Sequence, residues 1–252
     1  MTLRDHQRKD RALVVVAKAP LSGLVKTRLC PYLSPWQAAA LYECLLSDIV
    51  GKMEGYAEAD SWLAFAPEGE DYFRREYLHK RRLTQRGRDL GERLHHIFVD
   101  LFRMNYKQVI IADSDSPTVP LSSIKRAYER LSEDSCDVVL GPSEDGGYYL
   151  VGLRRAAEEI FRAIPWSTHA VLDLTLERAA AAHLRVALLP RAYDIDVKEN
   201  LSRLWQDFMT SKEARHLAPK TYAYLNTLYG QRTSTDVEIT ASAIKETVYE
   251  PQ

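Results

Sequence analysis

Short uninterrupted runs of apolar residues alternate along the chain with longer stretches in which apolar residues recur every three or four positions. The run Leu13–Ala17 (LVVVA) contains no polar residue, which is typical of a strand buried on both faces of a sheet. After Asp89, helical spacing is shown by Leu90, Leu94, Ile97, Phe98 and Leu101. The alternation predicts a three-layer α/β/α domain with a mostly parallel central sheet.

The same pattern gives the expected limits of the other elements. Further strands are expected at Trp62–Phe65, Val109–Ala112, Val138–Leu140, Tyr149–Leu153 and Val186–Leu189. Helices should begin at four capping positions, namely Ser34 (where a proline and a glutamine complete a capping box), Asp89, Ser122 or Ser123, and Ser167. We expect residues 1–11 to form a tail, residues 12–204 a single domain, and residues 205–252 a helical extension and tail.

Composition limits the classes of protein to which this chain could belong. The 252 residues carry a formal net charge of -1, with 46% apolar and 27% charged residues, so bulk charge indicates neither a nucleic-acid nor a membrane partner. The three cysteines are widely spaced, which favours reduced thiols in a cytoplasmic protein. The first eleven residues lack the apolar segment of a secretory signal. The sequence is also compatible with a homo-oligomer.

Candidate chemistry follows the expected strands, because ligands of parallel α/β sheets bind beyond the carboxyl ends of the strands. The stretch IIADSDSP ends a strand on Asp113 and Asp115, two residues apart, and a proline then stops strand pairing. Two carboxylates on one face repel each other unless a cation lies between them, and Mg²⁺ or Mn²⁺ would suit their hard oxygen atoms. An ordinary turn capped by Asp and Ser side chains is equally consistent with this stretch.

The loop after the first strand, AKAPLSGLVKTRL, is basic. Three cations flank a flexible glycine and a hydroxyl group, in the order Lys18, Gly23, Lys26, Thr27 and Arg28. Basic side chains and exposed backbone amides after a strand commonly bind phosphate. The loop lacks the residue order of a Walker A motif, and a solvated basic loop is the alternative.

Two later loops add acidic and aromatic groups. In GPSEDGGYYLVGL, Glu144 or Asp145 could serve as a general base, and the tyrosines that follow the glycines suit a sugar ring or ordinary packing. In YDIDVKENL, Asp194 and Asp196 again alternate after a strand, although Asp196 could simply cap the next helix. Between these regions, in QRGRDLGERL, Gln85 could read a nucleotide base with its amide.

Six motifs in this order resemble those of a family of small bacterial GT-A-like transferases long classed as a domain of unknown function. They are AKAPLSGLVKTRL, QRGRDLGERL, DSDSP, GPSEDGGYYLVGL, IPWSTHAVL and YDIDVKENL, and they span roughly residues 12–204. That family resembles nucleotide-diphospho-sugar transferases and, more distantly, the molybdenum-cofactor and phospholactate guanylyltransferases. Relatives usually have a glycine where this chain has Asp113, so the chain carries a literal Asp-x-Asp.

The resemblance implies a GT-A-like domain that binds a nucleotide with a divalent metal ion. The implied metal ligands are Asp115 and Asp196, with Asp113 as a further candidate. The implied nucleotide-binding residues are Lys18, Gly23, Lys26, Thr27, Arg28, Gln85, Asp89 and Gly91. The loop facing the transferred group or the acceptor corresponds to Asp145, Gly146, Gly147 and Tyr148.

The leading hypothesis is a metal-dependent glycosyltransferase that uses a nucleotide sugar and a small-molecule acceptor. In it, Lys26 and Arg28 stabilise the departing diphosphate, and Asp145 or Glu144 deprotonates the acceptor. The first alternative is a nucleotidyltransferase that joins an NTP to a phosphorylated small molecule and releases pyrophosphate. The second is a catalytically silent subunit that binds nucleotide.

Overall fold

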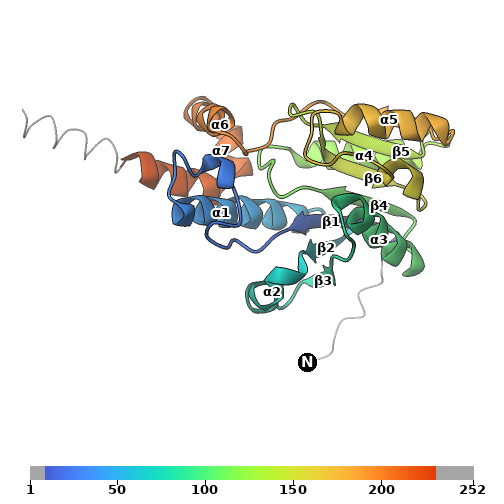
Figure 1. The fold of residues 1–252 in the computed structure, drawn as a ribbon, viewed down its shortest axis with the longest axis horizontal. Helices are drawn as coiled ribbons and strands as arrows, with labels where there is room; N and C mark the ends of the chain where they lie inside the picture. The colour runs from blue at the N-terminus through green and yellow to red at the C-terminus, as the bar shows by residue number, and fades with distance from the viewer. Residues whose placement is uncertain (1–8, 231–252) are drawn as a thin grey trace, which may run out of the picture.

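A seven-stranded sheet forms the centre of the molecule in this computed structural model, which describes residues 9–230 (Figure 1). The strands are β1 (Arg11–Ala17), β2 (Asp60–Phe65), β3 (Arg81–Thr84), β4 (Gln108–Ala112), β5 (Val138–Pro142), β6 (Tyr148–Leu153) and β7 (Val186–Leu188). Their order across the sheet is β3-β2-β1-β4-β6-β5-β7, and only β6 pairs antiparallel with its neighbours. The expected α/β class and the mostly parallel sheet are confirmed.

Helices cover both faces of the sheet. They are α1 (Pro35–Glu54), α2 (Glu70–Glu76), α3 (Leu90–Arg103), α4 (Leu121–Ser132), α5 (Val171–Ala181), α6 (Lys198–Thr210) and α7 (Lys212–Leu217), with residues 219–230 also helical. Apolar residues of α1 and α4 share one buried cluster with one face of the sheet, and those of α3 and α5 share a second cluster with the other face. The three layers are therefore helices, sheet and helices.

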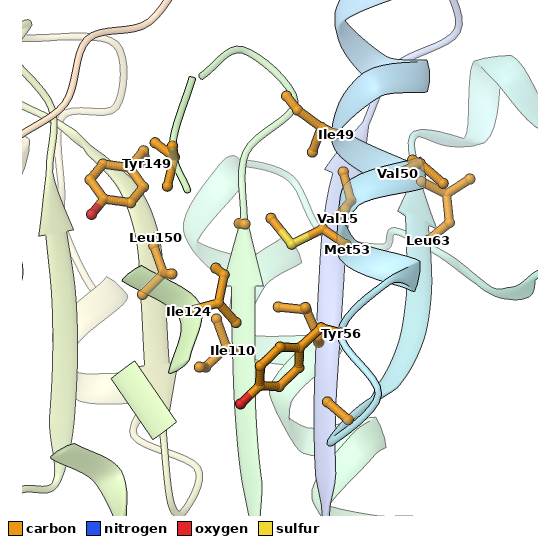
Figure 2. Close-up of a cluster of buried hydrophobic side chains, with 14 of the residues drawn as sticks. Val15, Ile49, Val50, Met53, Tyr56, Leu63, Ile110, Ile124, Tyr149 and Leu150 are labelled. Atoms are coloured by element: carbon orange, nitrogen blue, oxygen red, sulfur yellow. The ribbon is translucent and has the colours of Figure 1, made fainter. Parts of the chain in front are cut away.

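The first cluster packs α1 and α4 against the central strands β1 and β4. In Figure 2, Ile49 and Met53 of α1 lie against the strands that carry Val15 and Ile110, and Ile124 of α4 packs beside them. These five side chains are between 0% and 3% exposed. Burying each contributes about 1.5–3 kcal/mol, so this face alone anchors α1 firmly on β1 and β4.

Two of the expected helix starts are confirmed and two are wrong. Ser34 closes a capping box with Gln37, and Asp89 accepts a hydrogen bond from the backbone of Glu92 at the start of α3. Pro120, rather than either serine after it, precedes α4. Ser167 lies in the left-handed region at φ 67°, and α5 begins only at Val171, after a turn in which the Thr168 hydroxyl donates to the carbonyl of Pro165.

Two short elements, β3 and α2, were not expected from the sequence. The strand β3 reads RRLT and pairs only with β2, at the edge of the sheet, so it needs no continuous apolar run. The expected boundary between residues 204 and 205 falls inside α6, and β1 already begins at Arg11 within the expected N-terminal tail. The final residues, 231–252, lie outside the described part of the chain.

The C-terminal helices pack against the sheet domain rather than standing apart from it. A third cluster joins Leu204 and Phe208 of α6 to Leu41 of α1, and all three are completely buried. The Asp48 carboxylate of α1 accepts hydrogen bonds from the backbone of Lys220 at 3.0 Å and of Thr221 at 2.8 Å. No helix among residues 9–230 is both long and apolar enough to span a membrane.

Candidate functional site

A cavity opens at the carboxyl end of the sheet, where β1 and β4 lie side by side. From β1 the chain proceeds to β2 and β3 on one side, whereas β4 leads toward β6 and β5 on the other, so the two strands flank the switch point of the sheet. The loops that leave β1 and β4 border a cavity of about 610 Å³. Other walls are provided by the start of α3 and by the strand β6, including Leu90, Arg93, Leu94, Tyr148 and Tyr149.

The loops that carry Asp115 and Asp196 meet the basic first loop at one point of this cavity. The Lys26 ammonium donates to Asp115 Oδ1 at 2.5 Å and to Asp196 Oδ1 at 2.7 Å. These carboxylates are separated by 81 positions in sequence. The expected convergence of Asp115, Asp196 and the first loop is present, and the cation that joins the two carboxylates is a lysine of the chain itself.

Lys26 is unusually placed for a surface-loop lysine. Its side chain is only 3% exposed, whereas those of Asp115 and Asp196 are 35% and 40% exposed. Burial alone would lower the pKa of the Lys26 ammonium, but the two carboxylates outweigh burial and raise the pKa above its usual value. Lys26 therefore carries a positive charge whenever both carboxylates are ionised.

Asp113 does not join this carboxylate pair. Its Oδ1 accepts hydrogen bonds from the backbone amides of Asp115 and Ser116 at 3.3 and 3.2 Å, and its Oδ2 accepts one from the Ser116 hydroxyl at 2.7 Å. Burial and the nearby Asp115 charge raise the pKa of Asp113 to about 8. The turn interpretation of DSDS thus applies to Asp113, while Asp115 faces Lys26.

Tyr42 of α1 contributes to the site although the sequence pattern marks it only as a helical core residue. Its hydroxyl lies 2.8 Å from the Ser114 hydroxyl and accepts a hydrogen bond from the Lys18 amide at 3.1 Å. The Lys26 ammonium lies 5.7 Å from the centre of its ring. One buried side chain thereby links the loop after β1 to the loop after β4.

Further cations line the cavity, in two groups. Lys18 and Arg28 form no ion pair within residues 9–230 and are free to bind an anion. Arg88 instead pairs with Glu92, and Arg93 donates to the Gly87 carbonyl at 3.2 Å. Arg93 was missed in the sequence because nothing distinguishes it from other charged residues on an amphipathic helix.

The segment before α3 has largely structural contacts. Gln85 borders the cavity, but its amide nitrogen donates to the Ala64 carbonyl at 2.8 Å and to the Ala17 carbonyl at 3.4 Å. Its amide hydrogens are therefore bound to β2 and β1 rather than presented to a base. Asp89 caps α3 while bordering the cavity. At Gly91, a Cβ atom would meet the Phe161 carbonyl oxygen at 2.6 Å, so this glycine permits close packing and does not line the cavity.

The loop 143–148 lies beside the site, but its two acids, Glu144 and Asp145, are not among the residues that border the cavity. Glu144 forms an ion pair with Arg203 of α6, and Asp145 accepts a hydrogen bond from the Gly147 amide at 2.9 Å. Gly146 has φ 92°, and a Cβ atom there would meet the His169 carbonyl oxygen at 2.2 Å. Of the residues expected to face the acceptor, Tyr148 is the one that borders the cavity.

Asp194 is a second buried acid near the carboxylate pair. It is 8% exposed, and the Ser143 hydroxyl donates to its Oδ1 at 3.3 Å. Burial, followed by the charges of Asp196 and Asp145, raises the pKa of Asp194 to about 6. Among residues 9–230, no group of three or more His, Cys, Asp or Glu side chains is arranged to hold a metal ion.

Comparison with known proteins identifies relatives of this chain. Residues 49–168 match the family described as "Uncharacterized protein conserved in bacteria (DUF2064)". A crystal structure from Desulfovibrio desulfuricans G20, whose name assigns it provisionally to the nucleotide-diphospho-sugar transferases, is 30% identical, with a TM-score of 0.79 over 87% of this chain and 95% of that one. No curated protein is significantly similar in sequence.

More distant structures share the fold. The CMP-2-keto-3-deoxy-manno-octonic acid synthetase complexed with CTP is 12% identical, with a TM-score of 0.52 over 79% of this chain and 98% of that one. A cytidylyltransferase from Leptospira borgpetersenii is 6% identical, with a TM-score of 0.53 over 91% of this chain and 97% of that one. The resemblance stated from the six motifs is confirmed: the chain belongs to the DUF2064 family, within the nucleotide-diphospho-sugar transferase superfamily.

Proposed function

We propose that the protein is a metal-dependent transferase that uses a nucleotide-activated sugar. The observation that carries this proposal is the meeting of Asp115, Asp196 and the basic first loop at one cavity beside the switch point of the sheet. The name of the 30% identical relative supports the nucleotide-sugar class. In this reaction the bond between the anomeric carbon and the diphosphate breaks, and the nucleoside diphosphate leaves with the bonding electrons. The acceptor oxygen forms the new bond to that carbon, and its proton is released to the solvent.

The cavity offers separate surfaces for the two ends of a nucleotide sugar. Lys18 and Arg28 are positioned to bind the diphosphate oxygens, because both border the cavity and neither is committed to a carboxylate. Apolar side chains from α3, Leu90 and Leu94, supply a wall for the less polar part of the ligand. A volume of about 610 Å³ is within the usual range for a small-molecule site.

The carboxylate pair fits a divalent cation. Its two Oδ1 atoms both lie within 2.7 Å of one point, which is now taken by the Lys26 ammonium, and hard carboxylate oxygens are what Mg²⁺ and Mn²⁺ prefer. Mg²⁺ commonly binds one or two carboxylates and completes its shell with phosphates and water, so a third carboxylate is not required. When bound there, the ion would neutralise the charge that develops on the departing diphosphate.

A nucleotidyltransferase remains the second candidate. A triphosphate needs more cationic contacts than a diphosphate, and Arg88 and Arg93 could provide them if they exchanged their present partners for phosphate. We favour the nucleotide sugar because, among the cations of residues 9–230 that border the cavity, only Lys18 and Arg28 are uncommitted. Binding without turnover in either assay below would identify the silent subunit instead.

The test is a pair of product assays with Mn²⁺ and suitable acceptors. The wild-type protein should release free nucleoside diphosphate from at least one nucleotide sugar, and Asp115→Asn should reduce turnover by about 100-fold or more, comparable to removing a preorganised stabilising group. Asp134→Asn provides the matched control, because it removes one fully exposed carboxylate that does not border the cavity. Pyrophosphate release from an NTP, without release from any nucleotide sugar, would replace the proposal with its alternative.

A further inference from the structure

The position of the Lys26 ammonium has a consequence for how a metal ion reaches the carboxylate pair. The ammonium lies 2.5 Å from Asp115 Oδ1 and 2.7 Å from Asp196 Oδ1. A divalent ion held by the same two oxygens would have to lie between them, at or near the point that the ammonium takes. The ammonium and the ion cannot share that point, because both their volumes and their charges conflict.

We propose that Lys26 is the resident counter-cation of the Asp115–Asp196 pair and keeps divalent metal out until a polyphosphate draws the ammonium away. This inference rests on the proposed function and specifies how its metal site is regulated. Metal and nucleotide would then bind together. By thermodynamic linkage, each would raise the affinity for the other by the same factor.

The first loop has the features that such an exchange requires. Lys18 and Arg28 belong to the same loop and border the same cavity, so a polyphosphate held by them would lie near Lys26. The ammonium could then exchange carboxylate oxygens for phosphate oxygens and keep anionic partners throughout. The carboxylates face the cavity with over a third of their side-chain surface exposed, which gives an incoming ion access to them.

Part of this loop, before Val25, is free of core packing. Lys26 itself is held in the left-handed region at φ 49° and ψ 35°, an uncommon conformation for a residue with a side chain. Gly23 has φ 79°, and nothing lies within 4 Å of the position that its Cβ atom would take. Leu24, between them, is 65% exposed. Val25, by contrast, is only 6% exposed and packs against Ala39 and Tyr42. The exchange therefore requires movement of the Lys26 side chain rather than displacement of the whole loop.

The test measures Mn²⁺ binding by calorimetry in the absence of nucleotide. The wild-type protein should bind Mn²⁺ weakly, and Lys26→Met should bind it about tenfold or more tightly. Lys198→Met is the matched control, because it removes an exposed lysine that lies against the Tyr32 ring, two residues beyond Asp196, without touching the pair. Asp115→Asn should abolish the gain in the Lys26→Met background and change little in the wild-type background. Equal Mn²⁺ affinity in wild type and Lys26→Met would overturn the inference.

A second measurement needs no variant and separates exchange from simple electrostatic repulsion. Wild-type crystals soaked with Mn²⁺ alone should show no anomalous signal at the pair, whereas Mn²⁺ with tripolyphosphate should give one, with the Lys26 ammonium on a phosphate oxygen. Mn²⁺ bound while Lys26 still bridges both carboxylates would overturn the inference. Either failure leaves the product assays unaffected, so the proposed function is judged separately.

Discussion

At the scale of single residues, Tyr42 connects the two loops on which the site depends. Its hydroxyl contacts both the Ser114 hydroxyl and the Lys18 amide, and its ring lies beside the Lys26 ammonium. Ser114 is only 4% exposed, so water cannot easily replace a lost partner there. Tyr42 thus helps to fix the spacing between the loop after β1 and the loop after β4.

We expect Tyr42→Phe to destabilise the protein by about 1–3 kcal/mol, because the change leaves buried polar groups of both loops without their partner. Tyr72→Phe is the control: its hydroxyl donates to an exposed Glu43 carboxylate, and its loss should change stability by no more than about 0.5 kcal/mol. Urea denaturation of the variants measures both values. Equal effects of the two substitutions would contradict the role assigned to Tyr42.

The sequence indicated which residues meet at the candidate site better than it indicated what they contact. Asp115, Asp196 and Lys26 stood out because each follows an expected strand near other charged groups. That Lys26 would occupy the centre of the acidic pair depends on side-chain directions set by the tertiary fold, on which local spacing carries no information. The turn at Asp113 is local and was one of two interpretations of this stretch, but the spacing did not decide between them.

At the scale of elements, the edge strand β7 is tied to β5 by an arginine–carboxylate pair. Arg185 Nε donates to Asp137 Oδ2 at 2.8 Å, and its second nitrogen, Nη2, donates to Oδ1 at 3.1 Å. The hydrogen bonds from Arg185 lower the pKa of Asp137 to about 2. Because the folded-state pKa lies below the unfolded value, this stabilisation is present near neutral pH and is lost as the pH falls from about 4 toward 2.

Asp137→Asn should therefore reduce stability by up to about 1 kcal/mol at pH 7, the range measured for exposed ion pairs. The difference from wild type should shrink as the pH is lowered from about 5 to 2, since the wild-type carboxylate is then neutralised too. Asp134→Asn removes a fully exposed carboxylate and should have little effect at either pH. Denaturation curves across this pH range give the answer, and a difference independent of pH would argue against the pair.

Elements with strong patterns were predictable, and those with weak patterns were not. The continuous apolar run of β1 and the capping box of α1 led directly to elements that the structure confirms. The strand β3 lies at the sheet edge and carries two arginines, so it lacks an apolar signature. The starts of α4 and α5 were misplaced because several Ser, Thr and Pro residues compete at each turn, and only the backbone decides which one precedes the helix.

At the scale of the whole molecule, the C-terminal helices pack against the segments that carry the site residues. The third cluster contains Leu29, three residues after Lys26, and Ile195, next to Asp196, together with Leu204 and Phe208 of α6. All four are completely buried. The C-terminal part thus packs against the segments that bring Lys26 and Asp196 together. Sequence alone could not show this, because Leu29 precedes the other three residues by more than 150 positions.

The central claim is that Asp115 and Asp196 act together on the phosphates of a bound nucleotide. The most direct measurement is the thermal stabilisation by nucleotide sugars with Mn²⁺, compared between wild type and the variants Asp115→Asn and Asp196→Asn. At 100 times its Kd, a bound nucleotide sugar should add about 2.7 kcal/mol to the stability of the wild type, and each variant should lose most of that gain. Full stabilisation of both variants would contradict the claim.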